Sequence, residues 1–171
     1  ELRSKVGMVF QYPEYQLFAE TVEKDVAFGL KNFRKDLDEA DRSAAVRAAL
    51  ETVGLDYEEV CDKSPFELSG GQKRRVAIAG VIVTRPEVLI LDEPAAGLDP
   101  LGKAELMQLL HSIHGDWCKT VIIVSHQNKI MEIADNIVLL DKESAPVTGS
   151  REKMLPRLQN RGGVCAARKG V

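Results

Sequence analysis

Short apolar runs recur along the chain with a length that favours strands. They lie at residues 6–10 (VGMVF), 88–91 (VLIL), 121–124 (VIIV) and 137–140 (IVLL). Continuous runs of this length, without polar alternation, are typical of strands covered on both faces of a sheet. The segments between them have helical spacing. The pattern therefore predicts an α/β fold with a largely parallel sheet.

The sequence also indicates where two of the helical segments lie and which residues mark their ends. Apolar residues at every third and fourth position predict a helix from about Asp38 to Val53, and Gly54 is suited to end it in a left-handed cap. A second helix is expected after Pro100, a favoured first-turn residue, with leucines and Ile113 facing inward.

The chain reads as one domain, residues 1–171, with a helical insertion. No convincing strand occurs between Gln11 and Ser69, so we expect a helical subdomain at residues 12–80. The Gly-rich basic segment 161–171 is expected to be a mobile tail. Because an apolar strand begins within a few residues of Glu1, we interpret the sequence as a fragment incomplete at its N-terminus.

Composition narrows the classes of function. A net charge of -3 and a pI near 5.7 give no general electrostatic footprint for nucleic acid. The 3 cysteines lack metal-ligand spacing and read as reduced thiols. No apolar run reaches membrane-spanning length.

An acidic pair follows the second apolar run. Residues 88–91 deliver Asp92 and Glu93 to the carboxyl end of a strand, where ligands bind in open α/β sheets. Asp92 could hold Mg²⁺, and Glu93 could orient or deprotonate an attacking water. A buried strand ending in solvated acids explains this motif alone equally well.

A Ser-Gly-Gly turn precedes another helical segment. Residues 68–72 read LSGGQ, and Ser69 can cap the helix that follows. The side chains missing at Gly70 and Gly71 let backbone N–H groups approach a phosphate. A simple capping turn is the better interpretation of this pentapeptide by itself.

The order and spacing of these motifs resemble the ABC ATPases. The matching motifs are a glutamine loop (Gln11), a signature (68–72), a Walker B strand (88–93), a D-loop (96–99) and a switch histidine (His126). The resemblance extends over residues 6–141. It is closest to the ATPases of energy-coupling-factor importers of vitamins and metals, through residues 9–18, 20–29 and 64–67.

The resemblance implies a P-loop NTPase-like core and an ATPase that uses ATP and Mg²⁺ to energise a membrane importer. Two ATPase subunits, as a homodimer or heterodimer, would face head to tail, with each ATP between the phosphate loop of one chain and the signature of the other. Further partners would be an integral membrane coupling subunit and a substrate-binding membrane subunit, at the cytoplasmic face of the cell membrane.

The same resemblance assigns roles to residues of this chain. Glu93, His126 and Gln11 would be catalytic, and Asp92 and Gln11 would contact the metal. The nucleotide of the partner chain would be held by Leu68, Ser69, Gly70, Gly71, Gln72 and Asp99.

The family's phosphate-binding loop, the Walker A motif G-x-x-x-x-G-K-[ST], does not occur in these 171 residues. The near match at 97–104 fails, since Ala104 lacks the hydroxyl for the metal, Pro100 lacks an N–H, and Asp99 would face phosphate oxygens. We therefore expect this chain alone to be inactive, while its signature could still complete the site of an intact partner.

Two other functions are compatible with these motifs. DNA-maintenance ATPases of the same superfamily carry long heptad repeats between glutamine loop and signature, and residues 12–67 contain none. A non-catalytic remnant is the other alternative. The basic residues Lys73, Arg74 and Arg75 favour a solvated helix face over a nucleic-acid site, so no nucleic-acid partner is expected. The sequence does not name the transported solute.

Overall fold

A mixed sheet forms the centre of the computed structural model, which describes residues 2–140, 145–158 and 164–169. The 6-stranded sheet has the order β1-β2-β3-β6-β4-β5. Its strands are β1 (Val6–Val9), β2 (Val88–Asp92), β3 (Thr120–Ser125), β4 (Asn136–Leu140), β5 (Val147–Ser150) and β6 (Val164–Lys169). β1, β2 and β3 are parallel neighbours, whereas β6 is antiparallel to β3 and β4, and β5 is antiparallel to β4.

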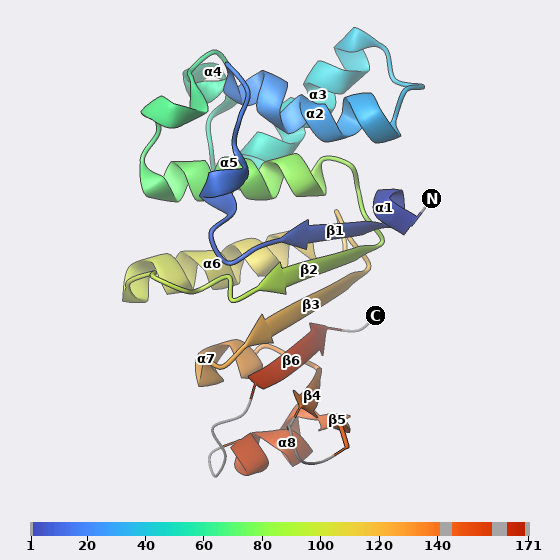
Figure 1. The fold of residues 1–171 in the computed structure, drawn as a ribbon, viewed down its shortest axis with the longest axis vertical. Helices are drawn as coiled ribbons and strands as arrows, with labels where there is room; N and C mark the ends of the chain where they lie inside the picture. The colour runs from blue at the N-terminus through green and yellow to red at the C-terminus, as the bar shows by residue number, and fades with distance from the viewer. Residues whose placement is uncertain (1, 141–144, 159–163, 170–171) are drawn as a thin grey trace.

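Between β1 and β2 the chain is entirely described and forms only helices. These are η1 (Pro13–Gln16), α2 (Val22–Phe33), α3 (Glu39–Thr52), α4 (Tyr57–Val60), η2 (Pro65–Glu67) and α5 (Gly70–Ile82). They gather at one end of the sheet, with α5 nearest to β1 (Figure 1). The remaining helices are α1 (Leu2–Lys5), α6 (Pro100–Ile113), α7 (Asn128–Met131) and α8 (Arg151–Leu158). The predicted fold class, an α/β core with an inserted helical subdomain, is confirmed.

Local signals in the sequence account for the predicted helix ends. A side-chain oxygen of Asp38 accepts a hydrogen bond from the Asp41 N–H and caps α3. Gly54, just beyond α3, has a φ of 73°, the left-handed region that glycine enters without steric cost. Pro100 occupies the first turn of α6, where its missing N–H leaves no hydrogen bond unmade.

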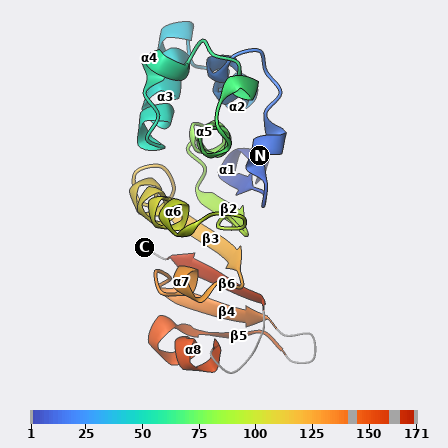
Figure 2. The same ribbon diagram turned by 90° about the vertical axis from the view of Figure 1, so that its left-hand side faces the viewer.

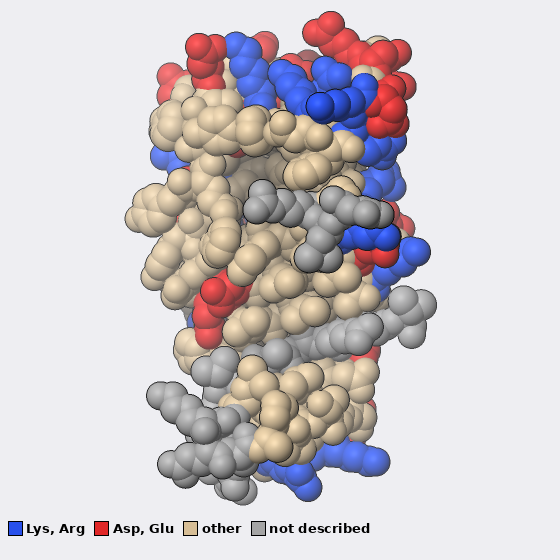
Figure 3. Space-filling view, turned by 45° about the vertical axis from the view of Figure 1, so that its right-hand side comes forward, with Lys and Arg blue, Asp and Glu red and all other residues tan. Residues whose placement is uncertain are grey.

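The two faces of the sheet are covered unequally, in contrast to the expectation of strands buried on both sides. Along β2 and β3 buried and half-buried residues alternate. Figure 2 shows α6 and α7 on one side of the sheet. The buried Val121 and Ile123 of β3 line a pocket together with residues of α6, so the buried side chains of this strand face that side. On an oblique view of the other side, a broad area largely free of Lys, Arg, Asp and Glu crosses the middle of the molecule (Figure 3).

The C-terminal segment also differs from expectation. Residues 164–169, expected to belong to a mobile tail, form β6 inside the sheet, while residues 161–163, 170 and 171 lie outside the described residues. The backbone groups of β3 and β4 need hydrogen-bond partners, and β6 supplies them on both sides.

Candidate functional site

The carboxyl ends of β1, β2 and β3 lie on the same side of the molecule as the first residues of α5 and α6, at the left in Figure 1. This arrangement follows from parallel strands joined by helical crossovers. The predicted residue Asp92 ends β2, and the predicted residues Gln11, Glu93 and His126 lie in the loops that follow β1, β2 and β3. Ligands of open α/β sheets bind at this edge.

The Glu93 carboxylate holds a small hydrogen-bonded cluster at this edge. Its Oε1 accepts a hydrogen bond from the His126 backbone N–H at 3.1 Å and lies 2.6 Å from His126 Nδ1. Its Oε2 accepts from the Ser125 hydroxyl at 3.2 Å. The Glu93 side chain is 17% exposed and that of His126 is 69% exposed. The structure thus brings together two predicted catalytic residues, with the imidazole open to solvent.

The backbone at Glu93 is strained in a way that aims the side chain. Its φ is 44°, in the left-handed region that non-glycine residues rarely occupy. Its N–H donates to the Val124 carbonyl at 2.8 Å, so the β2–β3 ladder holds this conformation. The carboxylate is thereby directed across to the end of β3 rather than along the strand.

Ser125 also belongs to this cluster, although it was not predicted as a site residue. Its side chain is fully buried, and its hydroxyl bonds to Glu93 and accepts from the Gln127 N–H. The available sequence signal for Ser125 was its position at the end of an apolar run, directly before His126. Sequence spacing does not show that the Ser125 hydroxyl meets the Glu93 carboxylate.

Asp92 is the residue that fits a metal, but only as one ligand. It ends β2 in register with Val124 and is half-buried. Among the residues that the structure describes, no group of three or more His, Cys, Asp or Glu side chains could hold a metal ion. Mg²⁺ in phosphate-transfer sites is held by one or two carboxylates together with phosphate oxygens. The oxygen donors of Asp92 and of the exposed Gln11, the two predicted metal contacts, are of the type that such a Mg²⁺ ion accepts.

The signature forms the open N-terminus of α5. The Ser69 hydroxyl accepts from the Gln72 N–H at 3.3 Å, and Gln72 Oε1 accepts from the Ser69 N–H at 3.0 Å, a complete capping box. A Cβ atom built on Gly70 or Gly71 would meet nothing within 4 Å. Packing within this chain therefore does not require glycine there, and the helix end is free to approach an anion.

Leu68 has a different place from the other signature residues. Its side chain is only 7% exposed and belongs to the core. It anchors the start of α5, and its side chain is not available to a nucleotide.

Asp99 caps α6, which explains the false match to a phosphate loop. Asp99 Oδ1 accepts from the Gly102 N–H at 2.7 Å, and Pro100 begins the helix. Residues 97–104 are therefore a turn and the first turn of a helix rather than a phosphate cradle. Asp99 itself is an exposed residue.

Arg74 was wrongly expected on a solvated helix face. It is 8% exposed and donates to the carbonyls of Gln11, Pro94 and Ala96. A signal for its burial does exist, since Ala77 and Ile78, three and four residues later, share its face of α5 and are buried.

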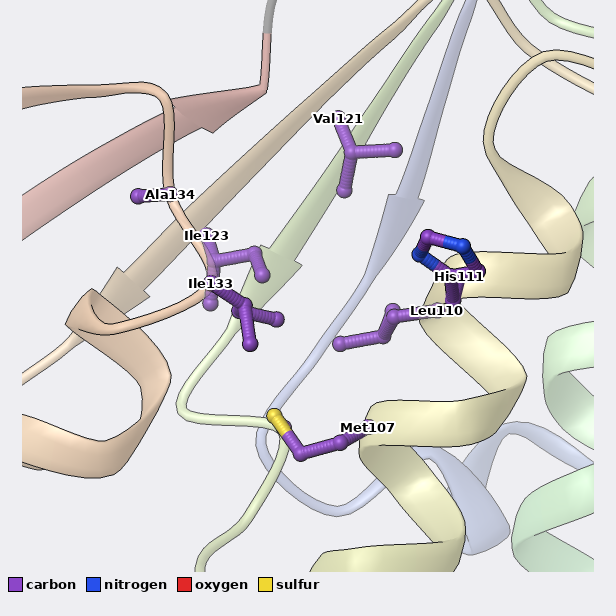
Figure 4. A pocket seen from close by; sticks show the side chains of 7 residues that line it. All are labelled: Met107, Leu110, His111, Val121, Ile123, Ile133 and Ala134. Carbon is purple, nitrogen blue, oxygen red and sulfur yellow. The ribbon is translucent and has the colours of Figure 1, made fainter.

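A small apolar pocket lies apart from these residues, between α6, β3 and the segment after α7 (Figure 4). Its lining consists of Met107, Leu110, His111, Val121, Ile123, Ile133 and Ala134. None of the predicted site residues lines it, so the candidate site is the strand edge rather than this pocket.

Within the described ranges 2–140, 145–158 and 164–169, no helix has the length and apolarity needed to cross a membrane.

Known proteins resemble this chain throughout its described core. The family model described as ABC transporter matches residues 1–96. An energy-coupling factor transporter ATP-binding protein, EcfA2, of Clostridium tetani is 53% identical over 150 residues, covering 87% of this chain and 51% of the relative. The EcfA2 of Bacillus cereus strain ATCC 14579 is 53% identical over 154 residues, covering 90% of this chain and 52% of the relative.

Solved structures give the same result. CbiO1 from Clostridium perfringens, part of an ABC transporter complex, matches with a TM-score of 0.74 and 38% identity over 94% of this chain and 66% of the other. The dimeric ABC transporter cassette MJ0796 matches with a TM-score of 0.70 and 27% identity over 87% of this chain and 64% of the other. The chain spans about half the length of the curated relatives it matches. By its sequence and by its fold, this chain belongs to the ABC transporter family.

Proposed function

We propose that this chain is part of an ATP-hydrolysing subunit that energises an importer of the energy-coupling-factor type. The observation that carries the proposal is the Glu93 carboxylate, fixed by Ser125 and His126 beside Asp92 at the carboxyl edge of parallel strands. The EcfA2 relatives, with about half of their sequence identical to this chain over the matched residues, support the importer class.

In this proposal each residue of the edge has one task. Glu93 accepts a proton from the attacking water, and Asp92 with Gln11 holds Mg²⁺ at the phosphates. His126, accessible beside Glu93, donates to developing negative charge on the transferred phosphoryl group. ATP with Mg²⁺ supplies the phosphoryl group, and the charge on the metal offsets that of the phosphate oxygens.

The phosphate cradle is not among these 171 residues, because no G-x-x-x-x-G-K-[ST] sequence occurs in them. We therefore propose that these residues alone do not hydrolyse ATP. ATPase turnover by the purified chain that Glu93→Gln abolishes would contradict this part of the proposal.

The signature can act on the nucleotide of a second ATPase subunit. Ser69, Gly70 and Gly71 present an uncovered helix end, and Asp99 is exposed at the start of α6. Backbone N–H groups at such an end attract the γ-phosphate of an ATP held by another chain. The dimeric form of the MJ0796 cassette is consistent with this two-chain arrangement.

A homologue with a complete phosphate loop but a Ser→Arg change in its own signature tests this arrangement. Its homodimer lacks a usable signature, so ATPase activity that appears on mixing must use the signature of this chain. We expect the wild-type chain to restore activity and Ser69→Arg to abolish the restoration. No restoration, or equal restoration by Ser69→Arg, contradicts the proposal.

Exposed aromatic residues on η1, on α2 and between them support docking to an integral membrane coupling subunit, which would in turn contact a substrate-binding membrane subunit. Tyr15 is 84% exposed. Phe18 and Phe28 are about half exposed, and their ring centroids lie 4.9 Å apart in an edge-to-face arrangement. Exposed aromatic clusters of this kind mark protein interfaces. The subunit would then lie peripherally at the cytoplasmic face of the membrane.

No observation favours the DNA-maintenance alternative. The longest helix between β1 and β2 is α3, with 14 residues, too short for the long coiled coil of that class.

A further inference from the structure

A single buried guanidinium, that of Arg74 on α5, joins two loops of the candidate site. Its Nη2 donates to the Gln11 carbonyl at 3.4 Å, and its Nη1 donates to the Pro94 carbonyl at 3.2 Å. Both nitrogens lie 3.3 Å from the Ala96 carbonyl. Its Nε is 3.6 Å from Glu14 Oε2, an ion pair without a hydrogen bond between these atoms.

Burying the Arg74 charge without these contacts would destabilise the fold. A buried charge destabilises the fold unless its donors are satisfied and an opposite charge is near. The planar fork of arginine can serve several acceptors at once, which the single ammonium of lysine cannot do from one position. Three backbone carbonyls and one carboxylate therefore hold the Arg74 side chain in a fixed position.

The carbonyls belong to segments with different tasks in the proposed function. Gln11 leads into η1, which packs on α5 and carries exposed Tyr15. Pro94 directly follows Glu93, and Ala96 begins the segment that ends at Asp99. A displacement of the Gln11 loop must therefore stretch the Arg74 hydrogen bonds or carry the segment 94–99 with it.

Arg74 also lies one turn from the glycines at the start of α5. Helical hydrogen bonds, such as that from the Lys73 N–H to the Ser69 carbonyl, connect the backbone of this first turn to the backbone that carries Arg74. The first turn therefore moves together with Arg74. The signature is thereby tied to both loops.

We propose that Arg74 is a positioning residue that couples the Gln11 loop, where a membrane subunit docks, to the segment after Glu93 and to the signature. The functional role of this coupling rests on the proposed function. The physical link between the two loops can be tested without ATP.

Arg75, the next residue on α5, is a matched control. It donates to the carbonyls of Val53 and Gly54 and pairs with Glu105. These contacts tie α5 to the end of α3 and to α6, and involve neither the Gln11 loop nor the segment 94–99.

Hydrogen exchange of the wild-type chain, Arg74→Gln and Arg75→Gln tests the link. The Tyr15 N–H, bonded to Tyr12, and the Ala96 N–H, bonded to Glu93, report on the two loops. We expect Arg74→Gln to accelerate exchange about tenfold or more in both loops. Arg75→Gln should accelerate exchange only near its own contacts, at Val53 and at Glu105, and in neither of the two loops. Unchanged exchange in either loop of Arg74→Gln, or the same pattern in Arg75→Gln, overturns the proposal.

Arg74→Lys serves as a second variant if Arg74→Gln fails to fold. It keeps the charge but cannot span both loops, so we expect accelerated exchange in at least one of them. Wild-type exchange in both loops of Arg74→Lys overturns the proposal.

The restored ATPase assay adds a functional readout. ATP is bound chiefly by the homologue, so Arg74→Gln should lower kcat about tenfold with a nearly unchanged KM for ATP. Arg75→Gln should keep kcat within about twofold of wild type. Equal kcat for wild type and Arg74→Gln contradicts the coupling. If even the wild-type chain restores no activity, the proposed function fails while the exchange result still decides the role of Arg74.

Discussion

His126 Nδ1 lies 2.6 Å from Glu93 Oε1, although 33 residues separate them in the sequence. The parallel pairing of β2 with β3 places the two residues at the same sheet edge. The left-handed conformation of Glu93 then turns its carboxylate toward the end of β3. This contact and the Ser125 hydroxyl define the position of the proposed general base.

Ser125→Ala should lower the free energy of unfolding by about 1–2 kcal/mol, because it leaves Glu93 Oε2 and the Gln127 N–H without their partner in a largely buried place. Urea unfolding measures the loss. Ser112→Ala, which removes an exposed hydroxyl bonded only to its own helix, should change stability by less than about 0.5 kcal/mol. Equal effects of the two changes would show that the Ser125 bond does not stabilise the Glu93 conformation.

Gly71→Ala separates function from stability at the signature. A Cβ there meets nothing in this chain, and alanine favours a helix over glycine by about 1 kcal/mol, so unfolding should require more urea than for wild type. The restored ATPase rate should nevertheless fall about tenfold or more, since the methyl group would face the partner's phosphate.

Gly80→Ala in the same helix is the control for that experiment. Its added Cβ would lie 3.8 Å from Val26, an ordinary contact. We expect a similar gain in stability without loss of ATPase restoration. A destabilised Gly71→Ala, or one that restores full activity, would argue against an open anion site at the start of α5.

Alkaline pH should destabilise the fold through Cys118. Burial raises the pKa of its thiol from 9.0 to about 11. The unfolded chain then loses this proton near pH 9 while the folded chain keeps it. The contribution of the Cys118 thiol to the free energy of unfolding is therefore complete below pH 9. It is lost as the pH rises toward 11, and the total loss is about 2–3 kcal/mol.

Urea unfolding between pH 8 and pH 11 checks this, with Cys118→Ala as the comparison. The variant should show a shallower fall in unfolding free energy across this range, since other alkaline groups titrate equally in both proteins. Parallel curves would mean that the Cys118 thiol does not contribute.

Tyr15→Ser should change the free energy of unfolding by less than about 0.5 kcal/mol, because the side chain is 84% exposed. Binding to a membrane coupling subunit in vesicles should weaken by about tenfold, since exposed tyrosines commonly carry interface energy. Leu101→Ser, at a 68% exposed position on α6, is the control and should bind as the wild type does. Equal binding by both variants and wild type would place the docking surface elsewhere.

Much of the fold can be predicted from local sequence. The apolar runs 88–91 and 121–124 fall within β2 and β3, and the capping signals at Asp38, Gly54 and Pro100 mark helix ends. These features depend on residues near in sequence, so periodicity and cap chemistry suffice. The grouping of Asp92, Glu93 and His126 at one edge follows from parallel strands.

Other features were decided only by tertiary contacts. Arg74 reads as one of three solvated cations, but carbonyls from two distant loops surround it and make its burial possible. Residues 164–169 have the composition of a tail, yet backbone groups of β3 and β4 pair with them. Leu68 belongs to a binding motif by sequence and to the core by packing.

The sequence by itself determined the order of motifs, the residues at the ends of the strands and the family resemblance, because these are properties of spacing along one chain. The tertiary structure decided which polar groups are buried together. A buried charge or hydroxyl needs hydrogen-bond partners, and these come from segments whose distance in space cannot be read from their separation in sequence.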